Sequence, residues 1–162
     1  MIYCYMETPL GRLLLAGEEE GLRLIGFPEG KGHKKPDQDW RKSDTAWKQV
    51  KIQLDEYFTG ERKIFDLDLA PCGTDFQMRV WDELLKIPYG ETRSYGDIAM
   101  KLGNPGAARA VGAANGRNPL PIVIPCHRVI GSNGSMTGFG GGIKTKEFLL
   151  QLETDNRQTR LL

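Results

Sequence analysis

The sequence predicts an α/β domain over residues 1–73, built from a small antiparallel sheet and one helix, and then a mostly α-helical domain over residues 74–162. Short strand-like runs separated by turn residues fill the N-terminal third. Helix-starting motifs recur in the second half, and the break Pro71-Cys72-Gly73 separates the two regions. A chain of 162 residues has room for two small domains that share a core.

The first strands of the N-terminal domain are expected to form a meander. Two turn-forming segments, Thr8-Pro9-Leu10-Gly11 and Glu18-Glu19-Glu20-Gly21, divide the apolar sequence into three short runs. Because turn residues bound each run, we expect neighbouring runs to pair as antiparallel strands. The predicted strands are Ile2–Met6, Arg12–Ala16 and Leu22–Phe27.

The rest of this domain predicts a loop, a helix and a further strand. Residues 28–44 are polar and contain Gly and Pro, which is typical of a loop. Residues Lys63–Leu69 alternate between polar and apolar, as a half-buried strand would. Between them, apolar residues recur at helical spacing up to the stop signal Gly60. These are Trp47, Val50, Leu54, Tyr57 and Phe58.

The C-terminal domain is expected to begin with a capped helix. Thr74-Asp75-Phe76-Gln77 is a capping box, in which two side chains bind free backbone N–H groups of the first turn. Apolar residues follow at helical spacing, and Pro88-Tyr89-Gly90 ends the segment. The apolar face consists of Phe76, Val80, Trp81, Leu84 and Leu85.

Two further helices across a tight turn predict a helix-turn-helix. Ser94-Tyr95-Gly96-Asp97 starts the first, and Gly103-Asn104-Pro105-Gly106 separates it from a second helix at Ala107–Asn115. The second helix consists almost wholly of Ala, Gly and Val, so its backbone can approach another surface closely. Arg109 is its only long side chain, and it has few groups that could read base edges. Such a helix would fit a sugar-phosphate wall or a minor groove.

Charge is distributed unevenly along a chain whose formal net charge is only +1. Residues 1–77 hold 11 basic and 14 acidic residues, a net of −3, whereas residues 78–162 hold 11 and 7, a net of +4. Five basic residues and one acid, Asp97, lie between Arg93 and Arg128. This asymmetry points weakly to a polyanion that meets the C-terminal domain, but on charge alone chance variation is the favoured interpretation.

The composition, 40% hydrophobic and 27% charged residues, is that of an ordinary globular protein. No segment is long and apolar enough for a membrane span, and the N-terminus MIYCYMETPLGR lacks signal-peptide features. The three cysteines are odd in number and far apart, which favours free thiols in a reducing compartment. We therefore expect a cytoplasmic protein, with the nucleus as the alternative.

A candidate nucleophile stands in the segment Ile122–Gly131. Val123 and Ile124 predict a short buried strand, and Pro125 fixes the entry to Cys126 at a strand-to-turn corner. A thiol attacks only after losing its proton, which nearby positive charge or a base promotes. His127 and Arg128 follow directly, although neighbours in an extended chain point to opposite faces. A contact between Cys126 and His127 therefore needs a turn or a bridging water.

Metal chemistry is not favoured by the sequence. A zinc deaminase would need a second cysteine where Val129 stands. Cys4, His33 and Cys72 could supply three ligands of a structural zinc, but they lack the close pairing that such sites show. We expect neither a metal ion nor a cofactor.

Three motifs in order give the chain a specific resemblance. Ala107–Gly112, Asn118–Ile122 and Pro125-Cys126-His127-Arg128-Val129 closely resemble the O6-alkylguanine-DNA alkyltransferases, also called methylated-DNA–[protein]-cysteine S-methyltransferases. The resemblance covers about residues Thr74–Glu153 and implies a winged helix-turn-helix in this half. The N-terminal half is less distinctively similar to the ribonuclease-H-like domain of that family.

The resemblance implies a set of catalytic residues. Cys126 matches the acceptor thiol, and His127 matches the base that deprotonates it through a water. Glu153, at the end of a predicted helix Lys144–Glu153, matches the carboxylate that orients the histidine, in a relay similar in logic to that of serine proteases. Tyr95 matches the tyrosine that hydrogen-bonds the flipped base.

The resemblance also implies how DNA and the base are held. Arg109 matches the arginine that enters the base stack, and Asn118 matches a hinge between recognition helix and active-site turn. The pocket is expected to comprise Tyr95, Val129, Phe139, Gly140 and Lys146. The DNA-facing residues are expected to be Ser94, Ala107, Ala108, Arg109, Ala110, Gly112, Ala113 and Arg128. Some family members have Tyr and Ser where this chain has Phe139 and Gly140, so any side-chain hydrogen bond from these positions is lost here, while a backbone N–H can still reach O6.

The implied activity is DNA repair by irreversible, stoichiometric transfer of the alkyl group of O6-alkylguanine, and of O4-alkylthymine, to Cys126. The damaged base would be flipped out of double-stranded DNA, and the protein would act as a monomer without an obligatory protein partner. The main alternative is a non-catalytic binder of alkylated DNA, which replaces the acceptor cysteine. The residues also leave open a cysteine hydrolase and a sequence-selective transcription regulator.

Overall fold

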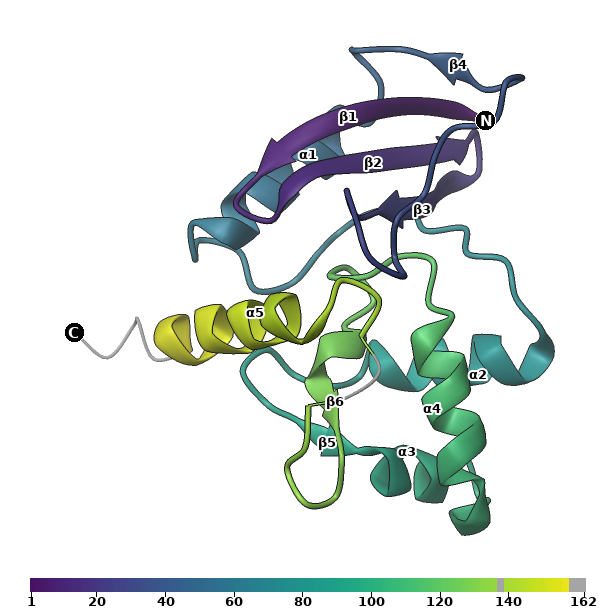
Figure 1. Cartoon of the computed structure of the whole chain (residues 1–162), viewed down its shortest axis with the longest axis vertical. Helices are drawn as coiled ribbons and strands as arrows, with labels where there is room; N and C mark the ends of the chain where they lie inside the picture. The colour runs from purple at the N-terminus through teal and green to yellow at the C-terminus, as the bar shows by residue number, and fades with distance from the viewer. Residues whose placement is uncertain (137–138, 158–162) are drawn as a thin grey trace.

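The N-terminal half contains a four-stranded sheet in the order β3-β2-β1-β4 (Figure 1). The computed structural model describes residues 1–136 and 139–157. Strands β1 (Ile2–Thr8), β2 (Gly11–Glu18) and β3 (Gly21–Gly26) pair antiparallel, as the meander pattern predicts. Strand β4 (Arg41–Lys42) pairs parallel with β1, so the sheet is mixed and not purely antiparallel. Strand β4 has no signal in the sequence because its two residues are exposed and polar.

The strand predicted at Lys63–Leu69 is wrong. Side chains in this segment do alternate in burial, with Phe65, Leu67 and Leu69 packed against the core. Its backbone, however, meets the sheet only at an isolated bridge between Leu69 and Leu22. Alternation shows which side of an extended segment is buried, but it does not supply a partner strand with which to form a ladder.

One helix, α1 (Lys48–Phe58), covers the sheet and buries Val50, Leu54 and Tyr57, as predicted. The residue before it, Trp47, has a left-handed backbone conformation with φ of 60°. Its indole Nε1–H donates to the carbonyl oxygen of Ile2 at 3.0 Å, which ties the start of the helix to β1. A non-glycine residue at positive φ is uncommon, and this hydrogen bond helps to hold it there.

The described residues of the C-terminal half form four α-helices: α2 (Asp75–Leu84), α3 (Tyr95–Lys101), α4 (Ala108–Gly116) and α5 (Ile143–Asn156). Both predicted capping boxes are present: Thr74 with Gln77 and Ser94 with Asp97. A short 3-10 turn, η1 (Pro105–Ala107), joins α3 to α4 in a helix-turn-helix (Figure 1). In the described part of the chain, no helix has the length and apolar character needed to cross a membrane.

A two-stranded parallel sheet in this half was not predicted. Strand β5 (Arg93–Ser94) pairs with β6 (Val129–Ile130), with Arg93 opposite Val129 and Ser94 opposite Ile130. Two residues per strand are too few to show a period in the sequence. This pairing fixes the start of α3 beside the segment that follows Cys126.

The predicted strand at Val123–Ile124 is also wrong. Residues 121–124 form a turn in which Ile122 has a φ of 76°. The chain then enters a 3-10 helix, η2 (Cys126–Arg128), so the thiol stands at a turn-to-helix junction. The expected burial is present, with Ile122, Val123 and Ile124 all less than 5% exposed. An apolar run shows burial, and here prolines at both ends prevent the ladder that a strand needs.

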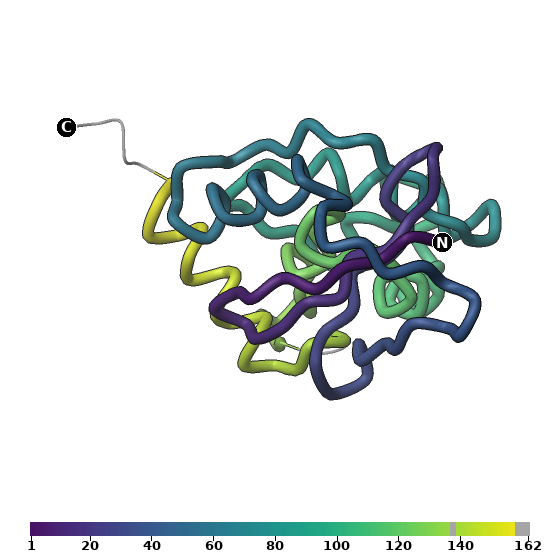
Figure 2. The backbone as a smooth tube through the Cα atoms, turned by 90° about the horizontal axis from the view of Figure 1, so that it is seen from above, coloured from purple at the N-terminus to yellow at the C-terminus, as the bar shows by residue number. Residues whose placement is uncertain are grey.

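The two halves share one hydrophobic core. The sheet lies over the turn that leads to Cys126, and the N–H of Ile25 donates to the carbonyl oxygen of Pro119 at 2.9 Å (Figure 2). Helix α5 lies below the sheet beside the other helices of the C-terminal half (Figure 1). The candidate nucleophile is thus enclosed by segments from both ends of the chain.

Candidate active site

Two asparagines hold the turn that presents Cys126. Asn118 accepts from the N–H of Leu120 at 2.9 Å and donates to the carbonyl oxygen of Ile124 at 2.8 Å, so it closes the turn from both sides. Asn115, inside α4, donates to the carbonyl oxygen of Cys126 itself at 3.3 Å. Asn115 thus joins α4 directly to Cys126, and Asn118 holds the intervening turn, where a hinge residue is expected.

The Cys126 thiol is only 5% exposed and is protonated at neutral pH. Burial raises its pKa to about 11, although the hydrogen-bonding side chain of Asn118 and the charge of Lys146 act in the opposite direction. A buried thiol disfavours the anion because the surroundings solvate it poorly. The thiol therefore needs a base to remove its proton.

His127 meets the requirements for that base. Its Nε2 lies 2.7 Å from Oε2 of Glu153, and an ionised carboxylate only accepts hydrogen bonds, so Nε2 carries the proton. The lone pair is consequently on Nδ1, which has no hydrogen-bond partner among the described residues. Burial lowers the pKa of His127 against the opposing effect of Glu153, which leaves a neutral imidazole able to accept a proton.

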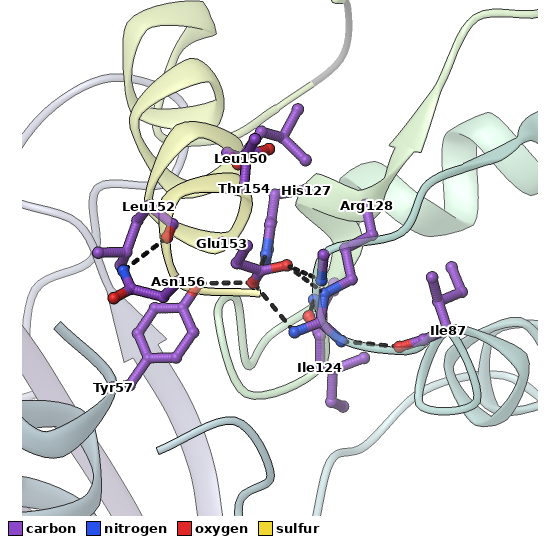
Figure 3. Close-up of polar contacts among 12 residues, drawn as sticks. Tyr57, Ile87, Ile124, His127, Arg128, Leu150, Leu152, Glu153, Thr154 and Asn156 are labelled. Atoms are coloured by element: carbon purple, nitrogen blue, oxygen red, sulfur yellow. Dashed lines mark hydrogen bonds and ion pairs between the residues drawn. The ribbon is translucent and has the colours of Figure 1, made fainter. Parts of the chain in front are cut away.

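Glu153 is fully buried at the centre of a cluster of hydrogen-bond donors (Figure 3). Besides His127, it accepts from the Tyr57 hydroxyl at 2.6 Å and from the N–H of Gly90 at 3.1 Å. Nε and Nη2 of Arg128 donate to its two oxygens at 2.8 and 3.0 Å. Burial raises the pKa of Glu153, but the bonds and charges of His127 and Arg128 together outweigh it and hold the pKa well below its usual range.

Arg128, which is expected on the DNA-facing surface, lies inside the fold. The side chain is 8% exposed, and its guanidinium donates to Glu153 and, through Nη1, to the carbonyl oxygen of Ile87 at 2.7 Å (Figure 3). All three donors point inward, because a carboxylate buried away from water is strongly destabilised unless a cation lies beside it. Arg128 is therefore a partner of Glu153, and its buried guanidinium has little surface left for a contact with DNA.

Residues expected to form the pocket lie around the same turn. Lys146 is fully buried, and its Nζ donates to the carbonyl oxygen of Val129 at 2.5 Å. The Phe139 ring packs on Phe27 with centroids 5.7 Å apart, and the carbonyl oxygen of Gly140 accepts from the N–H of Gly32 at 2.7 Å. The N-terminal half thus supports the loop that would form the pocket wall.

Tyr95 is half-buried at the start of α3 and faces α4. A Cβ added at Gly112 of α4 would stand 3.8 Å from the Tyr95 ring, so the small side chains of α4 give the ring its space. The β5–β6 pairing places the neighbouring Ser94 opposite Ile130, four residues beyond Cys126 in sequence. The expected base-contacting tyrosine is thereby tied to the active-site segment.

Helix α4 separates an inner apolar face from an outer face of small residues. Val111, Ala114 and Asn115 are buried, whereas Arg109, Ala110 and Ala113 are exposed. Ala107, Ala108 and Gly112 are half-buried, as is Ser94 at the start of α3. On the outer face the side chains are therefore so small that another molecule could approach the backbone closely, and Arg109 provides one long cationic side chain.

The three candidate zinc ligands lie apart. Cys4 is buried in β1, Cys72 is exposed and accepts from Arg23 at 2.8 Å, and Nδ1 of His33 lies 3.2 Å from the carbonyl oxygen of Phe27. Among residues 1–136 and 139–157, no group of three His, Cys, Asp or Glu side chains could hold a metal ion.

Sequence reasoning missed Tyr57, Gly90 and Asn115 in this site. Tyr57 belongs to the apolar stripe of its helix, and 96 residues separate it from Glu153. Gly90 contributes only its backbone N–H, which no residue type signals. Asn115 carried a usable signal, since a polar residue on the inner face of an apolar helix requires a hydrogen-bond partner.

Both halves of the chain match known proteins. Residues 75–155 match the family model described as 6-O-methylguanine DNA methyltransferase, DNA binding domain, and residues 1–71 match the ribonuclease-like domain of the same enzymes. A methylated-DNA–protein-cysteine methyltransferase of Methanosarcina acetivorans is 52% identical over 94% of this chain and 98% of its own length. One from Mycobacterium leprae is 48% identical over 99% and 98%. A crystal structure of Mycobacterium tuberculosis OGT in complex with DNA covers 96% of this chain and 94% of its own, with 49% identity and a TM-score of 0.90.

Proposed function

The chain belongs to the 6-O-methylguanine DNA methyltransferase family, and from this we propose that it repairs DNA by transferring the alkyl group of O6-alkylguanine to its own Cys126. It is a methylated-DNA–[protein]-cysteine S-methyltransferase that acts once, because the thioether product is not readily reversed. The observation that carries the assignment to Cys126 is the buried thiol followed directly by a neutral imidazole whose other nitrogen is fixed by Glu153.

The reaction is a displacement at the saturated carbon attached to O6. His127 Nδ1 takes the thiol proton, directly or through one water, and the Cys126 sulfur attacks the alkyl carbon. The sulfur–carbon bond forms as the carbon–O6 bond breaks, and the electron pair of that bond leaves with the purine. Tyr95 donates a proton to the leaving purine, and the proton that His127 took from the thiol then replaces the one that Tyr95 gave. Both residues return to their starting states, so the net products are an S-alkylcysteine and guanine.

The DNA-binding surface is the outer face of α4. The protein binds DNA, and we infer that the productive ligand is a duplex in which the damaged base is extruded at a cost of a few kcal/mol. Arg109 is exposed on this face and long enough to offset part of that cost by filling the gap in the stack. The basic residues of the C-terminal half add phosphate attraction that does not depend on sequence.

The alternative of a non-catalytic binder is not favoured. Such relatives replace the acceptor cysteine, whereas this chain retains Cys126 together with the base beside it. We further propose that the protein works as a cytoplasmic monomer, without an obligatory protein partner, and that O4-alkylthymine is a second substrate.

Mass spectrometry tests the proposed function directly. The protein is incubated with a duplex that contains O6-methylguanine and digested with trypsin, and the peptide Asn118–Arg128 is weighed. We expect this peptide to gain one methyl group on Cys126, in equimolar yield with the repaired base. Cys126→Ala should still bind the duplex but leave the lesion intact. Demethylation by Cys126→Ala, or repeated turnover by the unaltered protein, would contradict the mechanism.

A further inference from the structure

A residue of the N-terminal half reaches into the proton-transfer system. The hydroxyl of Tyr57, on α1, donates to Oε2 of Glu153, on α5, at 2.6 Å. The same oxygen accepts from Nε2 of His127 at 2.7 Å, so the tyrosine and the imidazole share one acceptor atom (Figure 3). Cys126, His127 and Glu153 all belong to the C-terminal half, so Tyr57 joins their network from the other half of the chain.

The Tyr57 ring is held in a fixed orientation. It is fully buried, and its centroid lies 5.5 Å from that of Phe65 and 6.2 Å from that of Tyr89. Burial, reinforced by the charge of Glu153, raises the pKa of Tyr57 well above its ordinary value, so the hydroxyl keeps its proton. Tyr57 is therefore a permanent donor whose direction is set by aromatic packing.

We propose that Tyr57 is a positioning residue for alkyl transfer: by donating to the oxygen that His127 also uses, it limits the negative charge offered to the imidazole and keeps His127 a neutral base. The inference rests on the proposed function. A carboxylate oxygen without this donor would attract the Nε2 proton more strongly and would stabilise the imidazolium ion. An imidazolium has no lone pair with which to take the thiol proton.

The other charged and titratable groups around His127 do not remove this effect. Helix α5 contributes Lys146 besides Glu153, and Arg128 and Cys126 flank the imidazole on η2. Lys146 and Arg128 disfavour a second positive charge, whereas Glu153 favours it. Tyr89 lies near the carboxylate from the loop after α2. Among these groups, Tyr57 is the neutral donor that acts on the same oxygen as the imidazole.

The pH profile of single-turnover methyl transfer tests the proposal. In Tyr57→Phe the ring packing is retained and only the hydroxyl is removed. We expect the acid limb of the profile to move to higher pH by roughly half to one pH unit. Transfer should be about threefold to tenfold slower at pH values below the limb, and the rate on the plateau at higher pH should be unchanged. Tyr89→Phe is the matched control, since its buried hydroxyl has no hydrogen-bond partner within the described residues. That control should leave the profile in place.

Site-specific 3-fluorotyrosine at position 57 provides a second variant that keeps the shape of the side chain. The fluorine makes the hydroxyl a stronger donor, so the acid limb should move to lower pH, opposite to the change in Tyr57→Phe. Equal slowing at every pH in Tyr57→Phe, or limbs that do not move in opposite directions, would overturn the proposal. If the unaltered protein transfers methyl groups to Cys126 and these profiles still coincide, the proposed function stands and only the role of Tyr57 fails.

Discussion

Replacing Arg128 by methionine is expected to destabilise the fold and to leave DNA affinity almost unchanged. The guanidinium makes three buried hydrogen bonds, two to Glu153 and one to the carbonyl oxygen of Ile87. Removing one partner of a buried ion pair costs about 3–5 kcal/mol, because the other charge stays buried. Tyr57, Gly90 and His127 still donate to Glu153, so we expect the lower end, about 3 kcal/mol.

Urea unfolding followed by circular dichroism measures this loss as a lower midpoint at an unchanged slope. Arg117→Met is the matched control, because Arg117 is an exposed arginine at the end of α4. It should change stability by no more than about 0.5 kcal/mol. If Arg117 contacts a phosphate, Arg117→Met should also reduce the slope of log binding constant against log salt concentration by about one. Arg128→Met should leave that slope unchanged.

The two measurements together decide the role of Arg128. A loss of stability below about 1 kcal/mol, combined with a reduced salt dependence, would mean that the guanidinium faces DNA and that its inward bonds contribute little. A large loss of stability with an unchanged salt dependence would agree with the buried ion pair.

Four further outcomes are expected. Arg109→Ala should have the melting temperature of the unaltered protein. The substitution should slow methyl transfer from duplex DNA more than transfer from single-stranded DNA, because only the duplex has a gap to fill in its base stack. Equal slowing on both kinds of DNA would refute this. Asn118→Ala removes two hydrogen bonds and should lower the free energy of unfolding by about 2 kcal/mol, measured by urea denaturation. Stability should be greatest between about pH 6.5 and 8.5: it falls at lower pH because the pKa of His127 is lowered in the fold, and it falls at higher pH because that of Cys126 is raised to about 11. Cys126→Ala should flatten the alkaline limb. Methylated protein should melt at a lower temperature, since the thiol is buried in a packed site.

Local signals predicted most of the fold. The meander, α1 and the capped helices followed from turn residues, apolar spacing and the Thr74 and Ser94 motifs, which act within a few residues. The strands predicted at Lys63–Leu69 and Val123–Ile124 fail because the position of apolar residues shows which side chains pack inward and does not supply a partner strand. Strands β4, β5 and β6 are two residues long and depend on pairing between distant segments.

The sequence predicts only those residues of the candidate site that belong to recognisable motifs. Cys126, His127 and Asn118 stand in recognisable order, but the direction in which a side chain points depends on tertiary structure. Arg128 illustrates the limit, because nothing in its neighbouring residues indicates that a carboxylate 25 residues away turns it inward. Tyr57 illustrates it further, since its partner lies in the other half of the chain.

The common core has a consequence for how the molecule comes apart. A protease that cuts the connection near residue 73 would leave two fragments, each with apolar surface that the other normally covers. We expect such fragments to remain associated, and heat to release them in one cooperative transition. The two halves, which the sequence separates as two domains, would then unfold as a single cooperative unit.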